Sequence, residues 1–453
     1  MTLASNLSAN SLESTNHQLE TLERRILSRE ARVGVVGLGY VGLPFALEKT
    51  KVGFHVLGIE QNPKRTQQVN QCDSYIDDVS SEALTQAVTS GKLQAMTDFD
   101  AVMDMDVVVI CVPTPLTKNL TPDLSYVESV AREIGQRLKP GQLVSLESTT
   151  YPGTTDDVIR PVLEEMSGLK QGKDFFLAHS PERVDPGNQR YTTQNTNKIV
   201  GASDPFSLQA AELFYQQTIA KVVPVTSAKA AELVKVFENT FRAVNIALVN
   251  ELTLLCDRLD LNVWEVLDAA NTKPFGIMPF YPGPGVGGHC IPIDPHYLEW
   301  KAKEVNFNTR FIALAGEINR RMPSFARSKA FRVLNQLGIA PSKAKILVLG
   351  ITYKKDLADW RESPAIEIIK FLLKDQVTLS YHDPYISEIT VNGLRFTSVD
   401  LTEEAVVSAD LVLIATDHSS IDYEWLVQHS KAVLDTRGAT RHLQGDLTKV
   451  TLL

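Results

Sequence analysis

Cysteine is scarce in this sequence, positive charge is not in excess, and no apolar run opens the chain. The four cysteines, at positions 72, 111, 256 and 290, lie far apart and match no metal-ligand spacing. We therefore expect reduced thiols of a cytoplasmic protein and no metal site. A net charge of −9 argues against nucleic acid as a partner, because binding its phosphates needs a basic face. The polar stretch at residues 1–17 argues against a signal peptide or a membrane span.

The length of 453 residues predicts two or three domains, because a single core rarely grows that large. The hydrophobic share of 43% and the charged share of 22% are those of an ordinary globular protein. Near the N-terminus, Leu19, Leu22 and Ile26 recur at helical spacing. They fit either a short amphipathic helix, packed on the body or on a partner subunit, or a mostly disordered tail. The expected segments are an N-terminal extension (1–30), a dinucleotide domain (31–220), a central helical segment (221–330) and a second nucleotide-type domain (335–453).

A glycine-rich turn connects the first expected strand, residues 32–36, to a helix that begins near Leu43. In a GxGxxG turn the first glycine permits the tight turn, the second lets the backbone approach a pyrophosphate, and the third allows close packing of helix and strand. The next strand ends at Glu60, whose carboxylate would bind the adenosine ribose hydroxyls and favour NAD over NADP. These flanking elements argue for a dinucleotide site over a purely structural turn. The loop residues are Gly37, Leu38, Gly39, Tyr40, Val41 and Gly42.

Three further strands are expected, at residues 106–112, 143–147 and 175–178. Alternating strands and helices imply a parallel sheet, with ligands at the carboxyl ends of its strands. Pro113, Thr114 and Thr149 follow two of these strands and are therefore expected beside the cofactor. Glu182 follows the third strand as either a general base or a surface carboxylate, and taken alone the surface role is favoured.

The middle of the chain holds a long helical pattern without proline or glycine, residues 227–259. It carries Lys235 and Asn239, which lie on one helical face and could either meet one ligand or simply be solvated. A helix of this length suits a spine or a subunit interface, so we expect a homodimer or a higher homo-oligomer. A further helix is expected to close at residues 317–320.

Cys290 lies in the glycine-rich run from Gly285 to Asp294. A thiol in such a loop could attack an aldehyde, and the oxidised adduct would be a thioester that water can hydrolyse. Asp294, four residues further on, supplies a nearby carboxylate. The alternative is a small buried cysteine beside a flexible loop.

A second nucleotide-type unit is expected after about residue 340. Its strands are expected at residues 345–350, 378–381, 410–414 and 432–438. This half lacks GxGxxG, which argues against a second NAD, but Lys354, Arg361 and Arg437 could meet a nucleotide diphosphate. The expected fold class is α/β, with two doubly wound Rossmann-like domains joined by a long central helix. Their strand ends would face one shared cleft, which the Cys290 loop could enter.

Six ordered motifs give the chain a family resemblance over residues 31–440. They are GLGYVG (37–42), STTYPGTT (148–155), SPE (180–182), ELVKVFENTFRA (232–243), GVGGHCIPID (285–294) and GITYKKDLADWRESP (350–364). The sequence resembles the UDP-glucose/GDP-mannose dehydrogenase family. This resemblance implies a four-electron oxidation of the primary alcohol of a UDP-sugar to a carboxylate, with two NAD molecules used in turn.

The same resemblance implies a role for each matching position. Cys290 would be the nucleophile, and Lys235 and Asn239 would stabilise negative charge on the C6 oxygen. Asp294 would assist proton transfer, while Thr149 and Glu182 would position and activate water. Tyr353 and Lys354 would contact the uracil and Arg437 the diphosphate. The remaining expected contacts are Arg65 for NAD and Arg183, Gly287 and His289 for the UDP-sugar.

Within the family, residues 271–290 are most similar to UDP-N-acetylglucosamine 6-dehydrogenases, including His289 before the nucleophile. An arginine that the family carries near Pro274 is missing here. UDP-N-acetylglucosamine is therefore the expected substrate, with UDP-glucose and UDP-N-acetylgalactosamine as alternatives. A non-catalytic, NAD-binding redox sensor is a further alternative, and the joint presence of Lys235, Asn239 and Cys290 argues against it.

Overall fold

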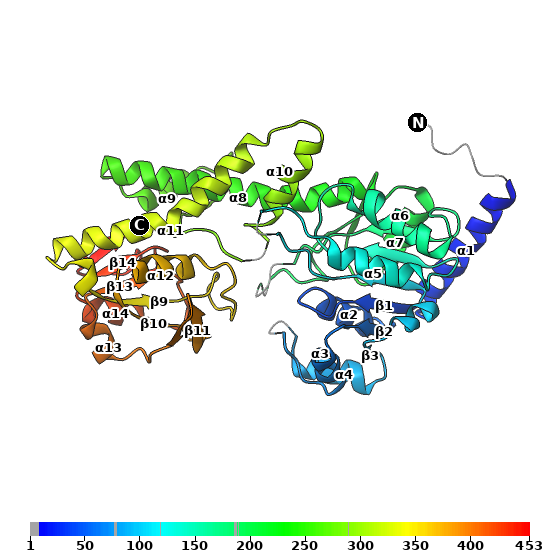
Figure 1. Ribbon diagram of the computed structural model, residues 1–453, viewed down its shortest axis with the longest axis horizontal. Coiled ribbons are helices and arrows are strands. Elements are labelled where there is room, and N and C mark those ends of the chain that lie inside the picture. The colour runs from blue at the N-terminus through cyan, green and yellow to red at the C-terminus, as the bar shows by residue number, and fades with distance from the viewer. Residues whose placement is uncertain (1–8, 77–78, 118, 185–187, 189, 289) are drawn as a thin grey trace. The chain divides into compact units, whose positions relative to one another are not determined.

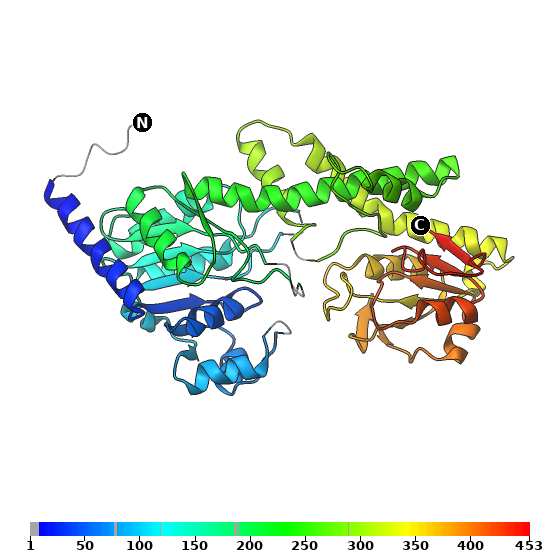
Figure 2. The same ribbon diagram turned by 180° about the vertical axis from the view of Figure 1, so that it is seen from behind.

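The computed structural model describes residues 9–76, 79–117, 119–184, 188, 190–288 and 290–453. The chain divides into two compact units, each built around its own sheet (Figures 1 and 2). Unit 1 comprises Met1–Glu238 and Trp300–Val305, and unit 2 comprises Asn239–Glu299 and Asn306–Leu453. None of the helices within the described ranges has an apolar stretch long enough to cross a membrane.

Eight strands form the sheet of unit 1: β1 (Arg32–Val36), β2 (His55–Ile59), β3 (Leu93–Met96), β4 (Val107–Ile110), β5 (Leu143–Leu146), β6 (Phe176–His179), β7 (Lys198–Ala202) and β8 (Val222–Val225). Their order is β3-β2-β1-β4-β5-β6-β7-β8. The parallel pairing that the sequence predicts holds except between β6 and β7, which are antiparallel. No helix connects these two strands in the described part of the chain, and an antiparallel return needs no crossover helix.

Helices cover both faces of this sheet, as a doubly wound fold requires. Neighbouring residues of β1 point to opposite faces, so Val35 joins the core under α2 and α7 while Val36 joins the core under α5 and α6. The helices of unit 1 are α1 (Ala9–Ser28), α2 (Gly42–Lys51), α3 (Pro63–Asn70), α4 (Ser81–Thr89), α5 (Ser125–Gly135), α6 (Arg160–Ser167) and α7 (Pro205–Gln216), with short η1 (Phe99–Asp104) and η2 (Thr154–Ile159).

In the described part of the N-terminal extension, Ala9–Ser28 form the helix α1 rather than a disordered tail. Leu19, Leu22 and Ile26 are buried in the core of unit 1, and α1 packs against α7. Arg25 adds an ion pair, because its Nη1 lies 3.0 Å from Asp106 Oδ1. The extension therefore packs on the body of its own chain.

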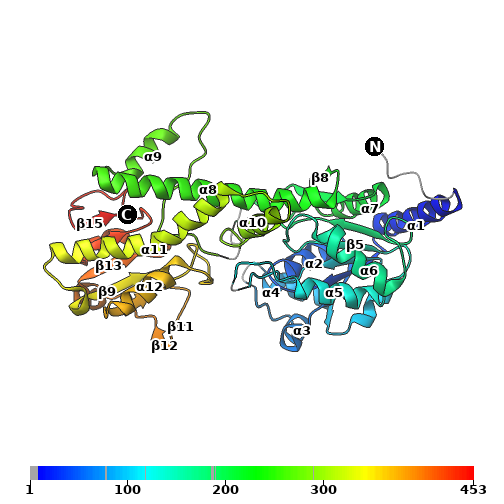
Figure 3. The same cartoon turned by 45° about the horizontal axis from the view of Figure 1, so that its top comes forward.

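The long central helix is α8 (Ala228–Leu259), and Figure 3 shows it as one uninterrupted rod. Its bounds match the pattern expected at residues 227–259. Its N-terminal part, to Glu238, belongs to unit 1, and the remainder belongs to unit 2.

Unit 2 has a five-stranded parallel sheet in the order β10-β9-β13-β14-β15 and a separate antiparallel hairpin of β11 and β12. The cores on its two faces lie under α11 and α12 and under α13 and α14. The strands are β9 (Lys345–Leu349), β10 (Thr378–His382), β11 (Glu388–Val391), β12 (Leu394–Thr397), β13 (Leu411–Ile414), β14 (Val433–Asp435) and β15 (Val450–Leu452). The helices are α9 (Val263–Asn271), α11 (Arg310–Gln336), α12 (Pro364–Lys374), α13 (Glu403–Ser408) and α14 (Tyr423–His429), with the short turn η3 (Pro341–Lys343). A further helix, α10 (Asp294–Glu304), begins in unit 2, and its part from Trp300 onward belongs to unit 1.

The expected end of a helix at residues 317–320 is wrong, because α11 continues through Pro323 to Gln336. A proline inside a helix costs about 3 kcal/mol, since it removes one backbone hydrogen bond and crowds the preceding turn. Met322, Ala326 and Ala330 follow helical spacing and are fully buried in the core of unit 2. Their packing offsets the cost of the proline.

Candidate active site

The glycine-rich turn of unit 1 leaves room for a ligand at one glycine and none at another. A Cβ on Gly42 would lie 1.8 Å from the Gly37 carbonyl oxygen, so α2 can start there only with glycine. A Cβ on Gly39 would meet nothing within 4 Å. Close backbone approach by a pyrophosphate is the reason a dinucleotide loop needs this second glycine. The turn therefore fits NAD.

Replacing Gly39 with valine is expected to leave folding unchanged and to weaken NAD binding by about a hundredfold. The added side chain enters open space in the protein itself but occupies the position that a pyrophosphate would approach, and a steric loss of a few kcal/mol corresponds to that factor. Calorimetric titration with NAD and a thermal unfolding curve measure the two effects. Unchanged NAD affinity in a folded Gly39→Val protein would show that the cofactor does not pass this glycine.

Glu60 is buried at the end of β2 and is tied to the glycine-rich turn. Its Oε2 accepts a hydrogen bond from Leu38 N at 3.0 Å, and its Oε1 accepts one from Asn62 N at 3.0 Å. The Tyr75 hydroxyl donates to the Leu38 carbonyl at 2.6 Å, and Arg65 Nη1 lies 4.0 Å from Glu60 Oε2. The structure thus brings the expected cofactor residues Leu38, Glu60 and Arg65 together, whereas Tyr40 is half exposed.

The loops after β4 and β5 meet at the same edge of the sheet. The Thr114 hydroxyl donates to the Thr149 carbonyl at 2.6 Å, and the Ser148 hydroxyl donates to the Val112 carbonyl at 2.7 Å. Thr114 is buried and Pro113 is exposed. These contacts join two segments that the sequence places beside the cofactor.

Glu182 is no surface carboxylate; it belongs to a buried group of three charges. Lys198 Nζ lies 3.0 Å from Glu182 Oε2 and 3.0 Å from Glu147 Oε2, and the side chains of Lys198 and Glu147 are almost fully buried. Burial would raise the pKa of Glu182, but the Lys198 charge and backbone donors lower it below its usual value. The pKa of Glu147 is raised, because burial and the Glu182 charge outweigh the attraction of Lys198. Lys198 therefore keeps Glu182 ionised inside the protein.

Two further carboxylates hold this region and have no counterpart among the expected site residues. Arg183 Nε donates to Glu238 Oε2 at 3.1 Å, so this expected substrate contact is engaged by an acid of α8. Glu232, also on α8, accepts from the backbone N–H groups of Gly153 at 2.5 Å and Thr155 at 2.8 Å. Glu232 thereby fixes the turn that follows Thr149. Lys235, one helical turn further on, is buried with 9% of its surface exposed.

The stability of unit 1 is expected to depend on the protonation of Glu232. Burial raises the pKa of its carboxyl from 4.5 to about 7, against the lowering effect of its three hydrogen bonds. Because the pKa is raised in the folded protein, protonated Glu232 stabilises the fold relative to the ionised form. This contribution to the free energy of unfolding is fully present below pH 4.5 and is lost as the pH rises through about 7. The loss approaches about 3 kcal/mol. Unfolding of the parent and of Glu232→Gln, followed from pH 4.5 to 8, should show this slope in the parent alone. Parallel pH profiles would contradict the raised pKa.

In unit 2, the structure brings three of the expected catalytic residues together. Asn239 Nδ2 donates to Asp294 Oδ2 at 2.5 Å, and both side chains are buried. Asp294 is the first residue of α10, and its backbone N–H donates to the Cys290 carbonyl at 2.8 Å. Cys290 itself is exposed, so the interpretation as a small buried cysteine is wrong. An accessible thiol thus lies one turn before a helix that begins with an oriented carboxylate.

The expected uridine residues of unit 2 lie against the loop that carries Cys290. A Cβ on Gly287 would come within 2.7 Å of Tyr353 Cβ, and a Cβ on Gly288 within 2.8 Å of its ring, so the Tyr353 side chain packs directly on these two glycines. A Cβ on Gly283 would lie 2.8 Å from Arg437 Nη1. His289 lies outside the described residues. Small residues in the loop therefore make space for Tyr353 and Arg437.

The two arginines expected at a diphosphate have different surroundings. Arg437 Nε donates to the Ala415 carbonyl at 2.9 Å, and burial lowers its pKa although Asp417 and Asp435 oppose the shift. Arg361 Nη2 instead lies 2.6 Å from Asp359 Oδ2 in a two-bond fork. Both contact the segment that leads to Cys290: the Arg437 side chain lies against Gly283, and the Arg361 carbonyl accepts from Gly288 N at 3.3 Å.

Most of the chain matches the domain models of one family. Three domain models of the UDP-glucose/GDP-mannose dehydrogenase family match in order: the NAD binding domain at residues 31–219, the central domain at 229–321 and the UDP binding domain at 347–442. These ranges contain the glycine-rich turn, the Cys290 loop and Tyr353, respectively.

Relatives with three different printed substrates are similar to this chain. The solved structure of a UDP-D-ManNAc dehydrogenase from Pyrococcus horikoshii has a TM-score of 0.84 and 34% identity, covering 93% of this chain and 98% of that one. An NDP-N-acetyl-D-galactosaminuronic acid dehydrogenase of Ralstonia nicotianae is 36% identical, covering 90% of this chain and 95% of the relative. A UDP-N-acetyl-D-glucosamine 6-dehydrogenase of Pseudomonas aeruginosa is 33% identical, covering 86% and 91%. The chain belongs to the UDP-glucose/GDP-mannose dehydrogenase family and is an NAD-dependent oxidoreductase.

Proposed function

We propose that this enzyme oxidises the C6 hydroxymethyl group of a UDP-N-acetylhexosamine, UDP-N-acetylglucosamine first, to the carboxylate. The observation that carries the proposal is the exposed Cys290 thiol beside the buried Asn239–Asp294 pair, with Tyr353 packed on the same loop. Similarity of residues 271–290 to UDP-N-acetylglucosamine 6-dehydrogenases favours that sugar. UDP-N-acetylmannosamine and UDP-N-acetylgalactosamine are the competing substrates. The UDP-D-ManNAc dehydrogenase and the NDP-N-acetyl-D-galactosaminuronic acid dehydrogenase are 34% and 36% identical to this chain, against 33% for the UDP-N-acetyl-D-glucosamine 6-dehydrogenase.

The proposed chemistry proceeds through a covalent adduct on Cys290. The alcohol first loses a hydride and a proton to give an aldehyde, and Cys290 Sγ adds to the aldehyde carbon to form a thiohemiacetal. Loss of a second hydride and proton gives a thioester, and attack by water breaks the C–S bond to release carboxylate and thiol. NAD, when bound, accepts the hydride in each oxidation, so two molecules are used in turn.

Each remaining site residue has a specific task in this proposal. Lys235 and Asn239 hold the C6 oxygen and stabilise negative charge on it. Asp294, oriented by the amide of Asn239, assists the proton transfers. Glu182, kept ionised by Lys198, accepts a proton from the attacking water, and the backbone around Thr149 positions that water. Tyr353 and Lys354 hold the uracil and Arg437 the diphosphate.

The test is an NADH-release assay across a panel of UDP-sugars, with the mass of each product measured. The proposal expects the highest kcat/KM for UDP-N-acetylglucosamine, two NADH per sugar, and a product heavier than the substrate by the exchange of CH2OH for COOH. A higher kcat/KM for an epimer would assign that epimer as the substrate and would leave the proposed reaction unchanged. No NADH release with any UDP-sugar would overturn the proposed reaction and favour the redox-sensor alternative.

We further propose that the enzyme is a homodimer that pairs through α8. Phe241, Leu248, Leu255 and Leu259 recur along this helix within unit 2, and all four are exposed. A monomer rarely exposes a continuous row of large apolar side chains to water. In a dimer with a twofold axis, this row would pack against the same row on α8 of the second subunit.

The double substitution Leu248→Glu and Leu255→Glu is expected to convert this dimer to a monomer. Burying two unpaired carboxylates per subunit costs more free energy than the association of two subunits through an interface of ordinary size provides. Light scattering after gel filtration measures the mass, and Leu394→Glu, a similarly exposed leucine of β12, serves as the matched control. A parent protein that is already monomeric would contradict the proposal.

A further inference from the structure

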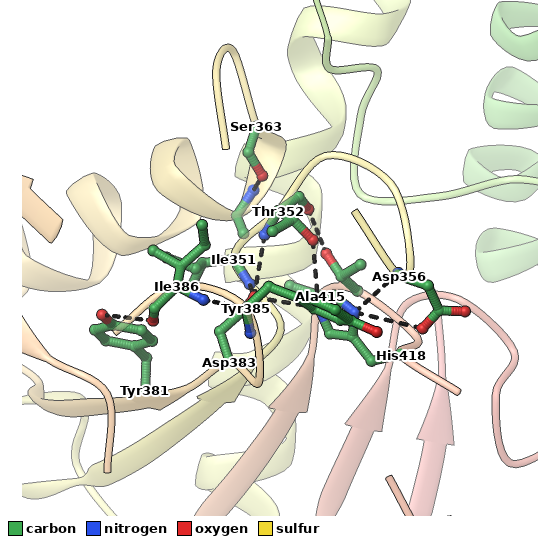
Figure 4. A network of polar contacts seen from close by, with 12 residues as sticks. Ile351, Thr352, Asp356, Ser363, Tyr381, Asp383, Tyr385, Ile386, Ala415 and His418 are labelled. Atoms are coloured by element: carbon green, nitrogen blue, oxygen red, sulfur yellow. Dashed lines mark hydrogen bonds and ion pairs between the residues drawn. The ribbon is translucent and has the colours of Figure 1, made fainter. Parts of the chain in front are cut away.

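The loop that follows β9 in unit 2 is held by buried side chains of the segments that follow β10 and β13. Residues 352–356 carry Tyr353 and Lys354, which the proposed function places at the uracil. Figure 4 shows Thr352 and Asp356 of this loop above Asp383 and His418. Asp383 is 4% exposed and His418 is fully buried.

Asp383 joins the ends of two strands through its two carboxylate oxygens. Its Oδ2 accepts from Ile351 N at 2.7 Å and from Thr352 N at 3.3 Å, where the chain leaves β9. Its Oδ1 accepts from Tyr385 N at 2.9 Å and from Ile386 N at 3.1 Å, where the chain leaves β10. Burial would raise the pKa of Asp383, but these donors and His418 lower it below its usual value. The carboxylate is therefore an ionised anchor for the start of the loop.

His418 holds the far end of the same loop, and its partners define its tautomer. The backbone N–H of Asp356 donates to Nδ1 at 3.1 Å, so Nδ1 carries no proton. The proton is on Nε2, which lies 3.1 Å from Asp383 Oδ2 and 3.2 Å from Thr352 Oγ1. The Thr352 hydroxyl in turn donates to the Lys354 carbonyl at 2.9 Å. The His418 ring thus links Asp383 to Thr352 and Asp356 of the loop, and through the Thr352 hydroxyl to Lys354.

Two more contacts close the arrangement from the segment after β13. The Ser419 hydroxyl donates to Asp356 Oδ2 at 2.6 Å, and the Ser419 N–H donates to Oδ1 at 2.8 Å. The Thr416 hydroxyl donates to the Thr352 carbonyl at 2.5 Å. Four of the backbone groups held in this way belong to the loop, namely the N–H and carbonyl of Thr352, the carbonyl of Lys354 and the N–H of Asp356. The network therefore fixes the conformation of the loop in addition to joining the ends of β9 and β10.

We propose that Asp383 and His418 are positioning residues for nucleotide recognition: they hold the Tyr353–Lys354 loop in the conformation that binds the uridine diphosphate part of the substrate. The inference rests on the proposed function, because it needs a uridine nucleotide at this loop. Neither residue needs to touch the ligand. Their effect is to remove the conformational freedom that the loop would otherwise lose on binding.

The experiment compares three variants of His418 by calorimetric titration of the full-length protein with UDP and, separately, with NAD. His418→Asn keeps an acceptor near the Nδ1 position, His418→Gln keeps a donor near the Nε2 position, and His418→Leu keeps neither. Loss of one hydrogen bond that orders the loop corresponds to about a tenfold weaker UDP binding. We expect that loss in the Leu and Gln variants, recovery in the Asn variant, and unchanged NAD binding in all three.

A destabilised control separates positioning from a merely structural role. Val406→Ala opens a small cavity in the core under α13, away from the loop, and should lower the melting temperature without changing UDP affinity. A folded His418→Leu protein with parental UDP affinity would overturn the inference, and so would an equal loss of UDP affinity in Val406→Ala. A parent protein that binds NAD but no UDP would overturn the proposed function itself.

Discussion

The substitution Cys290→Ser is expected to stop acid formation while NAD still binds. Serine preserves the size of the side chain, but its hydroxyl is a far weaker nucleophile than a thiol at neutral pH. Without covalent capture the aldehyde is neither held nor converted to a thioester, so production of the acid should fall on the order of a thousandfold or more. NADH release and the mass of the sugar product measure the reaction. Titration with NAD checks that the glycine-rich turn of unit 1 is intact.

The matched control is Cys72→Ser, a partly exposed cysteine near the end of α3. It should keep the activity of the parent, because no proposed step uses that thiol. An aldehyde product with one NADH per sugar from the Cys290 variant would locate the defect after the first oxidation. Release of the uronic acid at the parental rate would show that the covalent mechanism is wrong.

The substitution Lys198→Met is expected to destabilise unit 1 by about 3–5 kcal/mol, because it leaves two buried carboxylates without their shared cation. Glu182 in the parent has a lowered pKa in the folded protein. Its ionised form therefore adds to the free energy of unfolding above the pKa of the unfolded chain, and this contribution is lost as the pH falls through the pKa of the folded protein. In the variant, burial without the cation favours the protonated acids. The deficit in stability should therefore shrink as the pH is lowered from 7.5 to 5.

Denaturant unfolding of the two proteins at both pH values measures this deficit, and the exposed Lys221→Met is the control. Activity provides a second readout, since a Glu182 that is protonated at neutral pH cannot accept a proton from water. Thioester should accumulate in the variant and be visible by intact mass. Stability equal to that of the parent at pH 7.5 would contradict the role given to Lys198.

Local patterns predicted much of the fold and the parts of the site that lie close together in the sequence. The strand, glycine turn and acid around Gly39 and Glu60 follow from fixed spacing, and α8 follows from an unbroken helical period. Asn239 and Asp294 were expected to serve the same reaction, and the structure places them in direct contact. Pro323 misled the prediction of α11, because the packing that offsets it comes from residues distant in the chain.

The contacts that the sequence does not predict arise from the order of the strands in the two sheets. Lys198 reaches Glu182 and Glu147 across 16 and 51 residues, and it does so only because β7 returns antiparallel beside β6. His418 likewise reaches Asp356 across 62 residues, because β13 lies next to β9. A lone lysine or histidine at the end of a strand carries no signal of such a partner.

The packing of α1 bears on how this enzyme is handled in the laboratory. The family model begins at residue 31, so a designer who trims the chain to the matched region would delete α1. That deletion would place in water an apolar strip of α7 that Leu19, Leu22 and Ile26 cover, and would leave Asp106 without Arg25. A purification tag or fusion partner is better attached ahead of residue 9, with the first helix kept as an integral part of the fold.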